Sequence, residues 1–258
     1  MLVKDFSMDL FNLDGKVAIV TGSSTGIGQA FAYALAKAGA NIVITTHRNS
    51  ADETVKLIES TGREAIVVKG DLNSKEDRKK LIDTTIEKFG TIDILVNNAG
   101  TIKRAPILEH PDEFFENVID TNLKSVYYIS RDVARIMKNN GSGKIINVAS
   151  MLSFQGGKNV VGYTASKHGI AGVTKAFANE LSEYNIQVNA IAPGYVITNN
   201  TKPILEDEKR KLEISSRIPI KKWAYPVDIA GAVVFLSSRA SDYINGIILP
   251  VDGGWLSN

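Results

Sequence analysis

The stretch Lys16-Val17-Ala18-Ile19-Val20-Thr21-Gly22-Ser23-Ser24-Thr25-Gly26-Ile27-Gly28 decides the fold of this chain. It begins with an apolar run that predicts a buried strand, and an alanine-rich helical pattern follows it from Gln29. A glycine turn between a buried strand and a helix suits the phosphates of a dinucleotide, because the helix N-terminus offers free N–H groups and a partial positive charge.

The three glycines of this turn have separate expected roles. Gly22 permits the tight turn out of the strand, Gly26 lets backbone N–H groups approach a pyrophosphate, and Gly28 lets the helix lie close to the sheet. Their spacing differs from the commoner G-x-G-x-x-G pattern. Because glycines also punctuate ordinary strand-to-helix turns, the loop needs support from elsewhere in the chain.

Short apolar runs recur along the rest of the sequence and alternate with longer amphipathic stretches. Their near-continuous Val and Ile content predicts strands that are covered on both faces, as in a parallel sheet. We therefore predict an α/β fold, a single-domain Rossmann-like, doubly wound parallel sheet of about seven strands with helices on both faces. The predicted strands are residues 17–20, 42–44, 66–68, 94–96, 145–148, 188–191 and 247–251.

The length of 258 residues and the 44% hydrophobic content suit one core, so we predict a single domain over residues 1–258. Residues 1–13 form an N-terminal extension in this scheme. Residues 195–219 break the alternating pattern with Asn, Pro and a charged helical piece around 206–213. Their place after the sixth strand predicts a substrate loop that closes over the site.

Composition excludes several classes of partner. The net charge of +2 is small and the charged residues alternate in sign, so we expect no nucleic-acid partner. Cysteine is absent, which rules out disulfides, a thiol nucleophile and a thiolate metal site, and agrees with a reducing compartment. No run approaches about 18 apolar residues, so we expect no membrane partner either. These features predict a soluble, cytoplasmic protein.

Tyr163 and Lys167 are four residues apart in a helical pattern, so both side chains leave the same helix face. An adjacent ammonium is expected to lower the pKa of the phenol and prepare it for proton exchange. Ser150 ends the apolar run 144–149, which places its hydroxyl at the carboxyl end of a strand, where open α/β sheets bind ligands.

The same spacing also occurs in Tyr33 and Lys37, on the helix that follows the glycine loop. No serine-ended strand precedes that pair. A tyrosine and a lysine at this spacing are common in helical proteins, so the catalytic assignment depends on the joint presence of Ser150, Asn122 and the glycine loop.

Together these residues resemble the short-chain dehydrogenases/reductases, over about residues 15–255. The loop 21–28 resembles the cofactor turn of that family, and Asn-Asn-Ala-Gly at 97–100 resembles the motif that ends its fourth strand. The catalytic tetrad of the family matches Asn122, Ser150, Tyr163 and Lys167. The resemblance implies hydride transfer with a nicotinamide cofactor, in which the tyrosine exchanges a proton with the substrate oxygen.

The resemblance also implies the roles of the other members of the tetrad. Lys167 would lower the pKa of the tyrosine and hydrogen-bond the nicotinamide ribose. Ser150 would orient the substrate oxygen and stabilise charge on it. Asn122, through a helix carbonyl and water, would connect Lys167 to solvent.

The expected cofactor is NAD(H), towards which the closer resemblance leans, and NADP(H) stays open. An acidic residue at the end of the second strand would favour NAD, but Thr46, His47 and Arg48 stand there, and a neutral plus basic sequence tolerates a 2'-phosphate. Asp71 could contact adenine or only cap the helix that starts near Ser74. The implied cofactor-binding residues are Gly22, Ser24, Gly26, Ile27, Gly28, Thr46, His47, Arg48, Asp71, Leu72, Asn98, Ala99, Gly100, Tyr163, Lys167, Pro193, Gly194, Val196 and Thr198.

Within the family, one branch that acts on sugar acids matches over longer segments. These segments are residues 149–157, 163–167, 189–195, 198–201, 217–219 with Trp223, and 251–255. A sugar acid needs polar partners for its hydroxyls and a cation for its carboxylate. The candidate substrate residues are Ser150, Gln155, Tyr163, Asn199, Asn200, Arg104 and Arg217, with Lys103 as a further cation. Lys103 and Arg104 could equally be exposed loop residues.

Three alternatives are weighed against this interpretation. They are a neighbouring branch that acts on gluconate, a broader carbonyl reductase of the 3-oxoacyl-acyl-carrier-protein type, and a nucleotide-sensing protein that has lost catalysis. The resemblance further implies a homotetramer. The predicted helix 227–236 and the tail at Trp255, which is expected to be exposed, could pack against another subunit, or the helix could cover the sheet.

Overall fold

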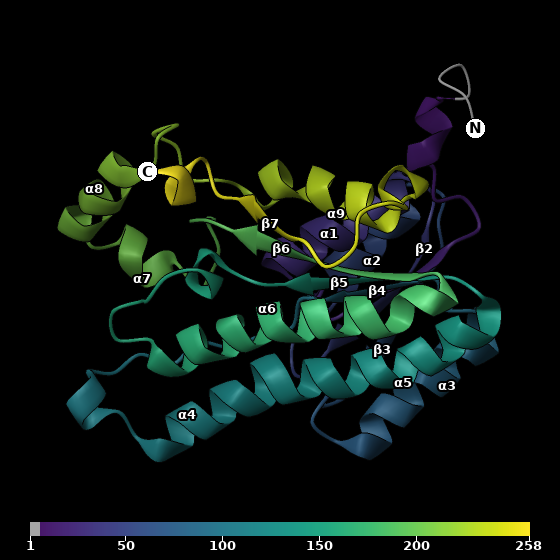
Figure 1. The fold of residues 1–258 in the computed structure, drawn as a ribbon, viewed down its shortest axis with the longest axis horizontal. Helices are drawn as coiled ribbons and strands as arrows, with labels where there is room; N and C mark the ends of the chain where they lie inside the picture. The colour runs from purple at the N-terminus through teal and green to yellow at the C-terminus, as the bar shows by residue number, and fades with distance from the viewer. Residues whose placement is uncertain (1–5) are drawn as a thin grey trace.

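The computed structural model describes residues 6–258 and has a central parallel sheet between two layers of helices (Figure 1). The strand order is β3-β2-β1-β4-β5-β6-β7, which confirms the predicted fold class. The strands are β1 (Val17–Val20), β2 (Asn41–Thr46), β3 (Ala65–Lys69), β4 (Ile94–Asn97), β5 (Gly143–Val148), β6 (Ile186–Pro193) and β7 (Ile248–Val251). Each predicted strand coincides with one of these to within a few residues.

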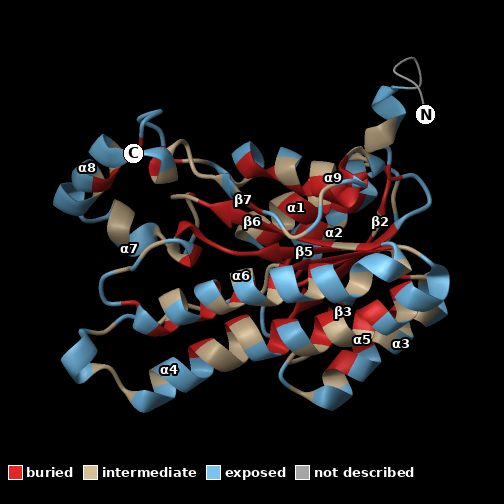
Figure 2. Cartoon of the chain, in the orientation of Figure 1, coloured by how far each residue is buried: buried red, intermediate tan, exposed pale blue. Residues whose placement is uncertain are grey.

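Helices cover both faces of the sheet because side chains of each strand alternate between two cores. On β1, Ala18 and Val20 face one core, and Val17 and Ile19 face the other. The first core is covered by α1 (Gly26–Lys37), α2 (Asp52–Glu59) and α9 (Ala230–Ser237), and the second by α3 (Lys75–Phe89), α5 (Ser125–Asn140) and α6 (Val161–Leu181). Figure 2 shows these helices buried towards the sheet and exposed on their outer sides.

The order of the strands reverses between β1 and β4, which lie side by side although β2 and β3 separate them in the sequence. All strands are parallel, so the segments that follow β1, β4, β5 and β6 all lie on the side of the sheet where the carboxyl ends of the strands are. In open α/β sheets this switch point is where ligands bind. The glycine loop, residues 97–100 and Ser150 therefore meet there.

The predicted substrate loop folds into α7 (Lys202–Leu205) and α8 (Glu208–Arg217), which lie beside the C-terminus in Figure 1. A small apolar cluster attaches this segment to the rest of the domain; its buried members are Met151, Ile214, Ile218, Trp223 and Trp255. We name it the loop cluster. The expectation of an exposed tail was wrong, because Trp255 is 6% exposed and packs within its own chain.

The helix predicted at 227–236 also packs within its own chain. Ala230, Val233 and Leu236 belong to the same core as α1, so α9 covers the sheet, as in one of the two alternatives. The remaining α4 (Asp112–Ile119) precedes α5. Residues 1–5 of the expected N-terminal extension lie outside the described part. Across residues 6–258, every helix is too short or too polar to traverse a lipid bilayer.

Candidate active site

The loop after β5 holds Ser150 against helix α6. Ser150 is 7% exposed, and its hydroxyl accepts a hydrogen bond from the backbone N–H of Leu152 at 3.1 Å. The hydroxyl of Ser153 accepts from the Ser150 N–H at 3.3 Å and donates to the carbonyl of Lys167 at 2.7 Å. One buried hydroxyl therefore ties the serine loop to the turn of α6 that carries the lysine.

Tyr163 and Lys167 lie one turn apart on α6, with the ammonium 5.4 Å from the centre of the tyrosine ring. Burial raises the pKa of Tyr163, and the hydroxyl of Ser150 and the guanidinium of Arg104 partly oppose that rise. The phenol is therefore protonated at neutral pH.

The sequence predicted that the Lys167 cation would lower the pKa of Tyr163, whereas the groups that lower it in this structure are Ser150 and Arg104. Lys167 is 5% exposed, and burial lowers its own pKa to about 8. The amine is thus neutral before the phenol ionises. Its Nζ donates to the carbonyl of Val148 at 2.6 Å, which fixes the side chain across the end of β5.

Replacing Lys167 with methionine is expected to stabilise the protein at pH 7 while it removes turnover. The pKa of Lys167 is about 8 in the folded protein and 10.5 for a lysine in the unfolded chain, so the buried charge costs about 3 kcal/mol below pH 8. Because the unfolded chain keeps its proton up to about pH 10.5, wild-type stability should rise relative to the variant between pH 8 and 10.5. Urea unfolding of both proteins across this range measures the difference; a difference that does not change with pH would contradict it.

Asn122 lies in a π-helical turn (Asp120–Lys124) between α4 and α5 and is 1% exposed. Its side-chain amide accepts from the N–H of Thr101 at 2.8 Å and donates to the Thr101 carbonyl at 2.9 Å. It also donates to the hydroxyl of Ser166 at 3.3 Å, one turn from Tyr163. Asn122 therefore fixes the loop after β4 against α6, and π-helical turns of this kind are frequent at functional sites.

Arg104 lies in the same loop after β4 and comes close to the reacting end of the site. Its charge is one of those that act on the Tyr163 phenol. Its Nη2 also donates to the carbonyl of Asn200 in the substrate loop at 3.1 Å. A cation between the phenol and this loop can receive a substrate carboxylate.

The glycine loop fits a dinucleotide. A Cβ on Gly28 would lie 2.9 Å from Ser23 Cα, and one on Gly22 would lie 2.9 Å from Ala99 Cα, so the turn has no room for side chains there. A Cβ on Gly26 would instead meet only Thr198 Cγ2, at 3.7 Å, within 4 Å. Among the described residues, no side chain hydrogen bond caps the N-terminus of α1 at Thr25. Its N–H groups face this space and suit a pyrophosphate.

The loop after β4 supports this turn. The side-chain amide of Asn98 donates to the carbonyls of Thr21 and Gly22 at 2.9 and 3.0 Å. The hydroxyl of Thr21 accepts from the backbone N–H groups of Asn98 and Ala99, both at 2.9 Å. These four hydrogen bonds make the turn and the Asn98-Ala99-Gly100 segment one rigid unit across the switch point.

The ends of β2 and β3 lie next to each other on the other side of the glycine loop, with Thr46 paired to Lys69. The Thr46 hydroxyl donates to the carbonyl of Asn49, while His47 and Arg48 are exposed. Asp71 does not cap α3, because Ser74 is the capping residue. The Asp71 carboxylate instead accepts from the N–H of Asn73 at 2.9 Å, within its own loop.

The remaining candidates lie in several places. Gly194 follows β6, where a Cβ would lie 2.7 Å from Asp252 Cα, and the N–H of Thr198 donates to the Thr201 hydroxyl. Asn199 and Asn200 are exposed and lie in the predicted substrate loop. Gln155, five residues after Ser150 in the sequence, is partly buried. Two candidate cations lie against aromatic rings. Arg217 lies over the Trp255 ring at 4.3 Å, and Lys103 lies over the Phe114 ring at 5.3 Å.

Ser153 was not among the residues predicted from the sequence, although it links Ser150 to Lys167. A serine three residues after Ser150 is a weak signal, because the capping of a short turn is its ordinary role. The packing of α6 leaves Ser153 only 7% exposed and brings its hydroxyl to the carbonyl of Lys167, and the sequence does not encode this packing locally.

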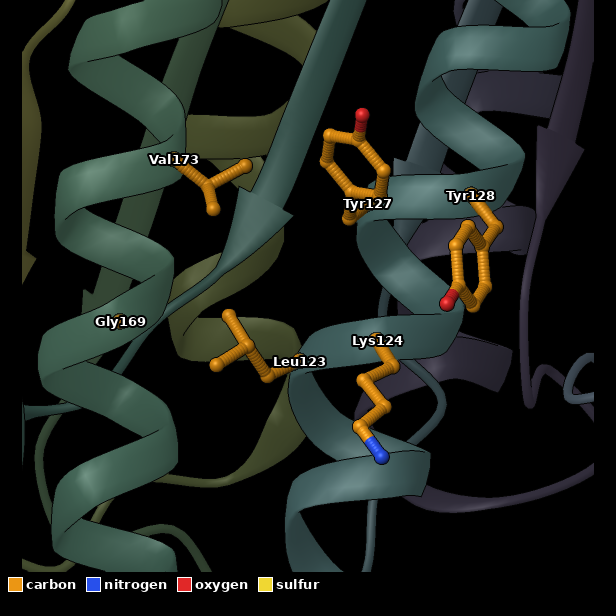
Figure 3. Close-up of a pocket in the computed structure, with 6 residues that line it drawn as sticks. All are labelled: Leu123, Lys124, Tyr127, Tyr128, Gly169 and Val173. Atoms are coloured by element: carbon orange, nitrogen blue, oxygen red, sulfur yellow. The ribbon is translucent and has the colours of Figure 1, made fainter.

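A groove on the outer surface lies between α5 and α6 and is separate from this site. Figure 3 shows its lining, in which Leu123 and Val173 point into the space between the two helices and Tyr127 and Tyr128 stand on α5. Lys124 lies at its edge. The groove contains none of the candidate catalytic residues and is therefore not part of the candidate active site.

The comparisons with known proteins agree with this geometry. Residues 22–256 match the family model described as Enoyl-(Acyl carrier protein) reductase. The chain is 53% identical to the 2-dehydro-3-deoxy-D-gluconate 5-dehydrogenase of Bacillus subtilis (strain 168), over 96% of this chain and 98% of that protein. It is 48% identical to the protein of the same name from Escherichia coli (strain K12), over 97% and 99%. It also superimposes on a gluconate 5-dehydrogenase from Burkholderia cenocepacia J2315 in complex with NADP and tartrate, with a TM-score of 0.92, 35% identity and coverage of 97% and 98%.

Proposed function

This chain belongs to the short-chain dehydrogenase/reductase family, and on that basis we propose that it interconverts 2-dehydro-3-deoxy-D-gluconate and its C5 ketone. It is an oxidoreductase that uses NAD(H) or NADP(H). Full-length similarity to two dehydrogenases of this name carries the choice of substrate. The tetrad and the phosphate-binding turn support the reaction class.

The residues of the site divide the chemistry between them. When bound, the nicotinamide dinucleotide supplies the acceptor or donor of a hydride at C5 of the sugar acid. Tyr163 exchanges the proton at the C5 oxygen, and its raised pKa keeps it protonated for the reducing direction at neutral pH. Ser150 orients that oxygen, since its hydroxyl lies close enough to the phenol to lower the pKa of Tyr163.

A panel of substrates tests the proposal directly. Purified protein is tested with 2-dehydro-3-deoxy-D-gluconate and gluconate in the presence of an oxidised cofactor, and with a 3-oxoacyl thioester in the presence of a reduced cofactor. Each reaction is followed by the absorbance of the reduced nicotinamide, with NAD(H) and with NADP(H). The 2-keto-3-deoxy acid should give the highest kcat/KM. Higher activity on gluconate would assign the chain to the gluconate-specific branch, and binding of dinucleotide without any turnover would leave only a sensing role.

Arg104→Met tests the position of the sugar-acid carboxylate. The guanidinium acts on the Tyr163 phenol and holds Asn200, so its loss should raise KM for the sugar acid by roughly 10–100-fold, the cost of a charge-assisted bidentate pair. Lys103→Met is the matched control, because Lys103 lies over Phe114 on α4. Equal KM values for the two variants would place the carboxylate elsewhere.

The assembly we propose is a homotetramer in the cytoplasm. The apolar groove between α5 and α6, where Tyr127 is 39% exposed, supports the assembly into an oligomer. The absence of cysteine supports the location, because it suits a reducing compartment. Light scattering at several protein concentrations gives the molar mass, and a monomer at micromolar concentration would contradict the tetramer.

A further inference from the structure

Arg78 is a buried charged residue that the mechanism above does not use. It lies on the first turns of α3 and is 5% exposed. Its closest carboxylate, that of Asp132 on α5, stands 3.6 Å from Nε, beyond hydrogen-bonding distance, and Nε has no hydrogen-bond partner within the described residues. Burying a cation with so loose an ion pair is costly.

The other contacts of Arg78 hold the loop after β3. Nη1 donates to the carbonyl of Leu72 at 2.7 Å and to that of Asn73 at 3.0 Å. On the opposite side, the guanidinium lies 4.8 Å from the ring centre of Tyr128 on α5. A planar cation between an aromatic ring and two carbonyls is a geometry that lysine does not reproduce. Arg78 thus connects the loop rigidly to α5.

This loop lies where the adenosine half of a dinucleotide must go. The phosphates are placed at the N-terminus of α1, and Ser150 and Tyr163 place the nicotinamide on the side of β4, β5 and β6. The other half therefore extends over the ends of β2 and β3. Thr46 is the last residue of β2, and Asp71 lies in the loop that follows β3.

The backbone of this loop is held in one conformation by several bonds. The Asp71 N–H donates to the Asp77 carboxylate at 2.7 Å, and the Asp71 carboxylate accepts from Asn73 at 2.9 Å. With the two carbonyls bound by Arg78, the loop is ordered before any ligand arrives. A site that is ordered in advance binds more tightly, because the ligand does not have to order it.

We propose that Arg78 is a positioning residue for the adenosine half of the cofactor, acting through the carbonyls of Leu72 and Asn73 without touching the ligand. The inference rests on the proposed function, since it needs a dinucleotide site. It predicts that loss of the guanidinium weakens cofactor binding and leaves the chemistry at Tyr163 unchanged.

The test compares Arg78→Met with wild type in two measurements. Calorimetry with ADP-ribose, which lacks the nicotinamide, and with the preferred reduced dinucleotide should show both dissociation constants raised about tenfold, the scale of a lost hydrogen bond to a charged group. At saturating cofactor, kcat and the KM for the sugar acid should stay within about twofold of wild type.

Two further variants make the result specific. Arg131→Met is the matched control, because Arg131 also pairs with Asp132, at 2.9 Å, and lies 5.7 Å from the Tyr128 ring, but its side chain is 40% exposed and, among the described residues, it makes no hydrogen bond to the loop. It should bind both ligands as wild type does. Arg78→Lys, which keeps the charge and one donor, should restore part of the affinity, and it serves as the test variant if Arg78→Met does not fold.

The outcomes separate the two proposals. Unchanged dissociation constants in both Arg78 variants, beside tight binding by wild type, would overturn the role of Arg78 alone. A fall in kcat that matches the loss of affinity would also overturn it, because general misfolding lowers both. If wild type bound neither ADP-ribose nor dinucleotide, the proposed function itself would fail.

Discussion

Tyr163→Phe is expected to lower turnover by about 10²–10⁴-fold, the usual contribution of a positioned general acid or base. The variant loses only the phenolic oxygen, so the ring stays in place on α6 and the dinucleotide should bind with near-normal affinity. The reason for the loss is specific to this environment, in which the hydroxyl of Ser150 and the charge of Arg104 both lower the pKa of the phenol. Steady-state kinetics with the sugar acid, beside calorimetric titration of the cofactor, separates the two effects.

The chain supplies a matched control for this experiment. Tyr33 lies one turn before Lys37 on α1, with the lysine 5.7 Å from its ring centre, almost the same local geometry as the pair on α6. Lys37 is exposed. Tyr33→Phe should therefore leave turnover unchanged. If Tyr163→Phe kept more than about a tenth of wild-type activity, the proton donor would have to be another group.

The second large effect is expected at Gly28. A methyl group there would overlap the side-chain amide of Asn98 and the carbonyl of Gly22, and would lie 2.9 Å from Ser23 Cα. Two of these neighbours are backbone, and Asn98 is held by hydrogen bonds, so none can move freely. Gly28→Ala should cost about 1–3 kcal/mol of stability through overpacking and should abolish measurable dinucleotide binding at micromolar concentrations.

Gly172→Ala is the control for that substitution. Gly172 is in the middle of α6, and a Cβ there would meet no atom within 4 Å. Alanine should stabilise the helix by about 0.5–1 kcal/mol and leave cofactor affinity unchanged. Thermal unfolding and calorimetry on both variants provide the comparison. If Gly28→Ala matched Gly172→Ala in both measurements, close packing at the turn would not be needed.

The strands were predictable because β-branched runs buried on both faces have few alternatives in an α/β chain. The glycine turn was predictable for a related reason, since its residues are neighbours in the sequence and act as one local unit. The ends of the strands were harder to predict. Strand β6 extends to Pro193, two residues beyond the predicted strand, because its pairing with β7 continues there.

The electrostatics of the site depended on packing that no local pattern encodes. Spacing places Lys167 near Tyr163, but the pKa of each group follows from burial, which the sequence reports only indirectly. The two Tyr-Lys pairs show the limit clearly, because their spacing and ring distances are alike while their surroundings differ. Hydrogen bonds that join separate elements, such as Ser153 to Lys167 and Arg104 to Asn200, could not be predicted for the same reason.

The loop cluster has an optical consequence. The chain has two tryptophans, Trp223 and Trp255, and both belong to this cluster, where each ring lies about 5 Å from that of Tyr195. The Trp223 indole also donates to the hydroxyl of Ser215 on α8, at 2.9 Å. The tryptophan emission of this protein therefore originates in the cluster that attaches the segment of α7 and α8, and its intensity should report, without a label, any change in the packing of that segment.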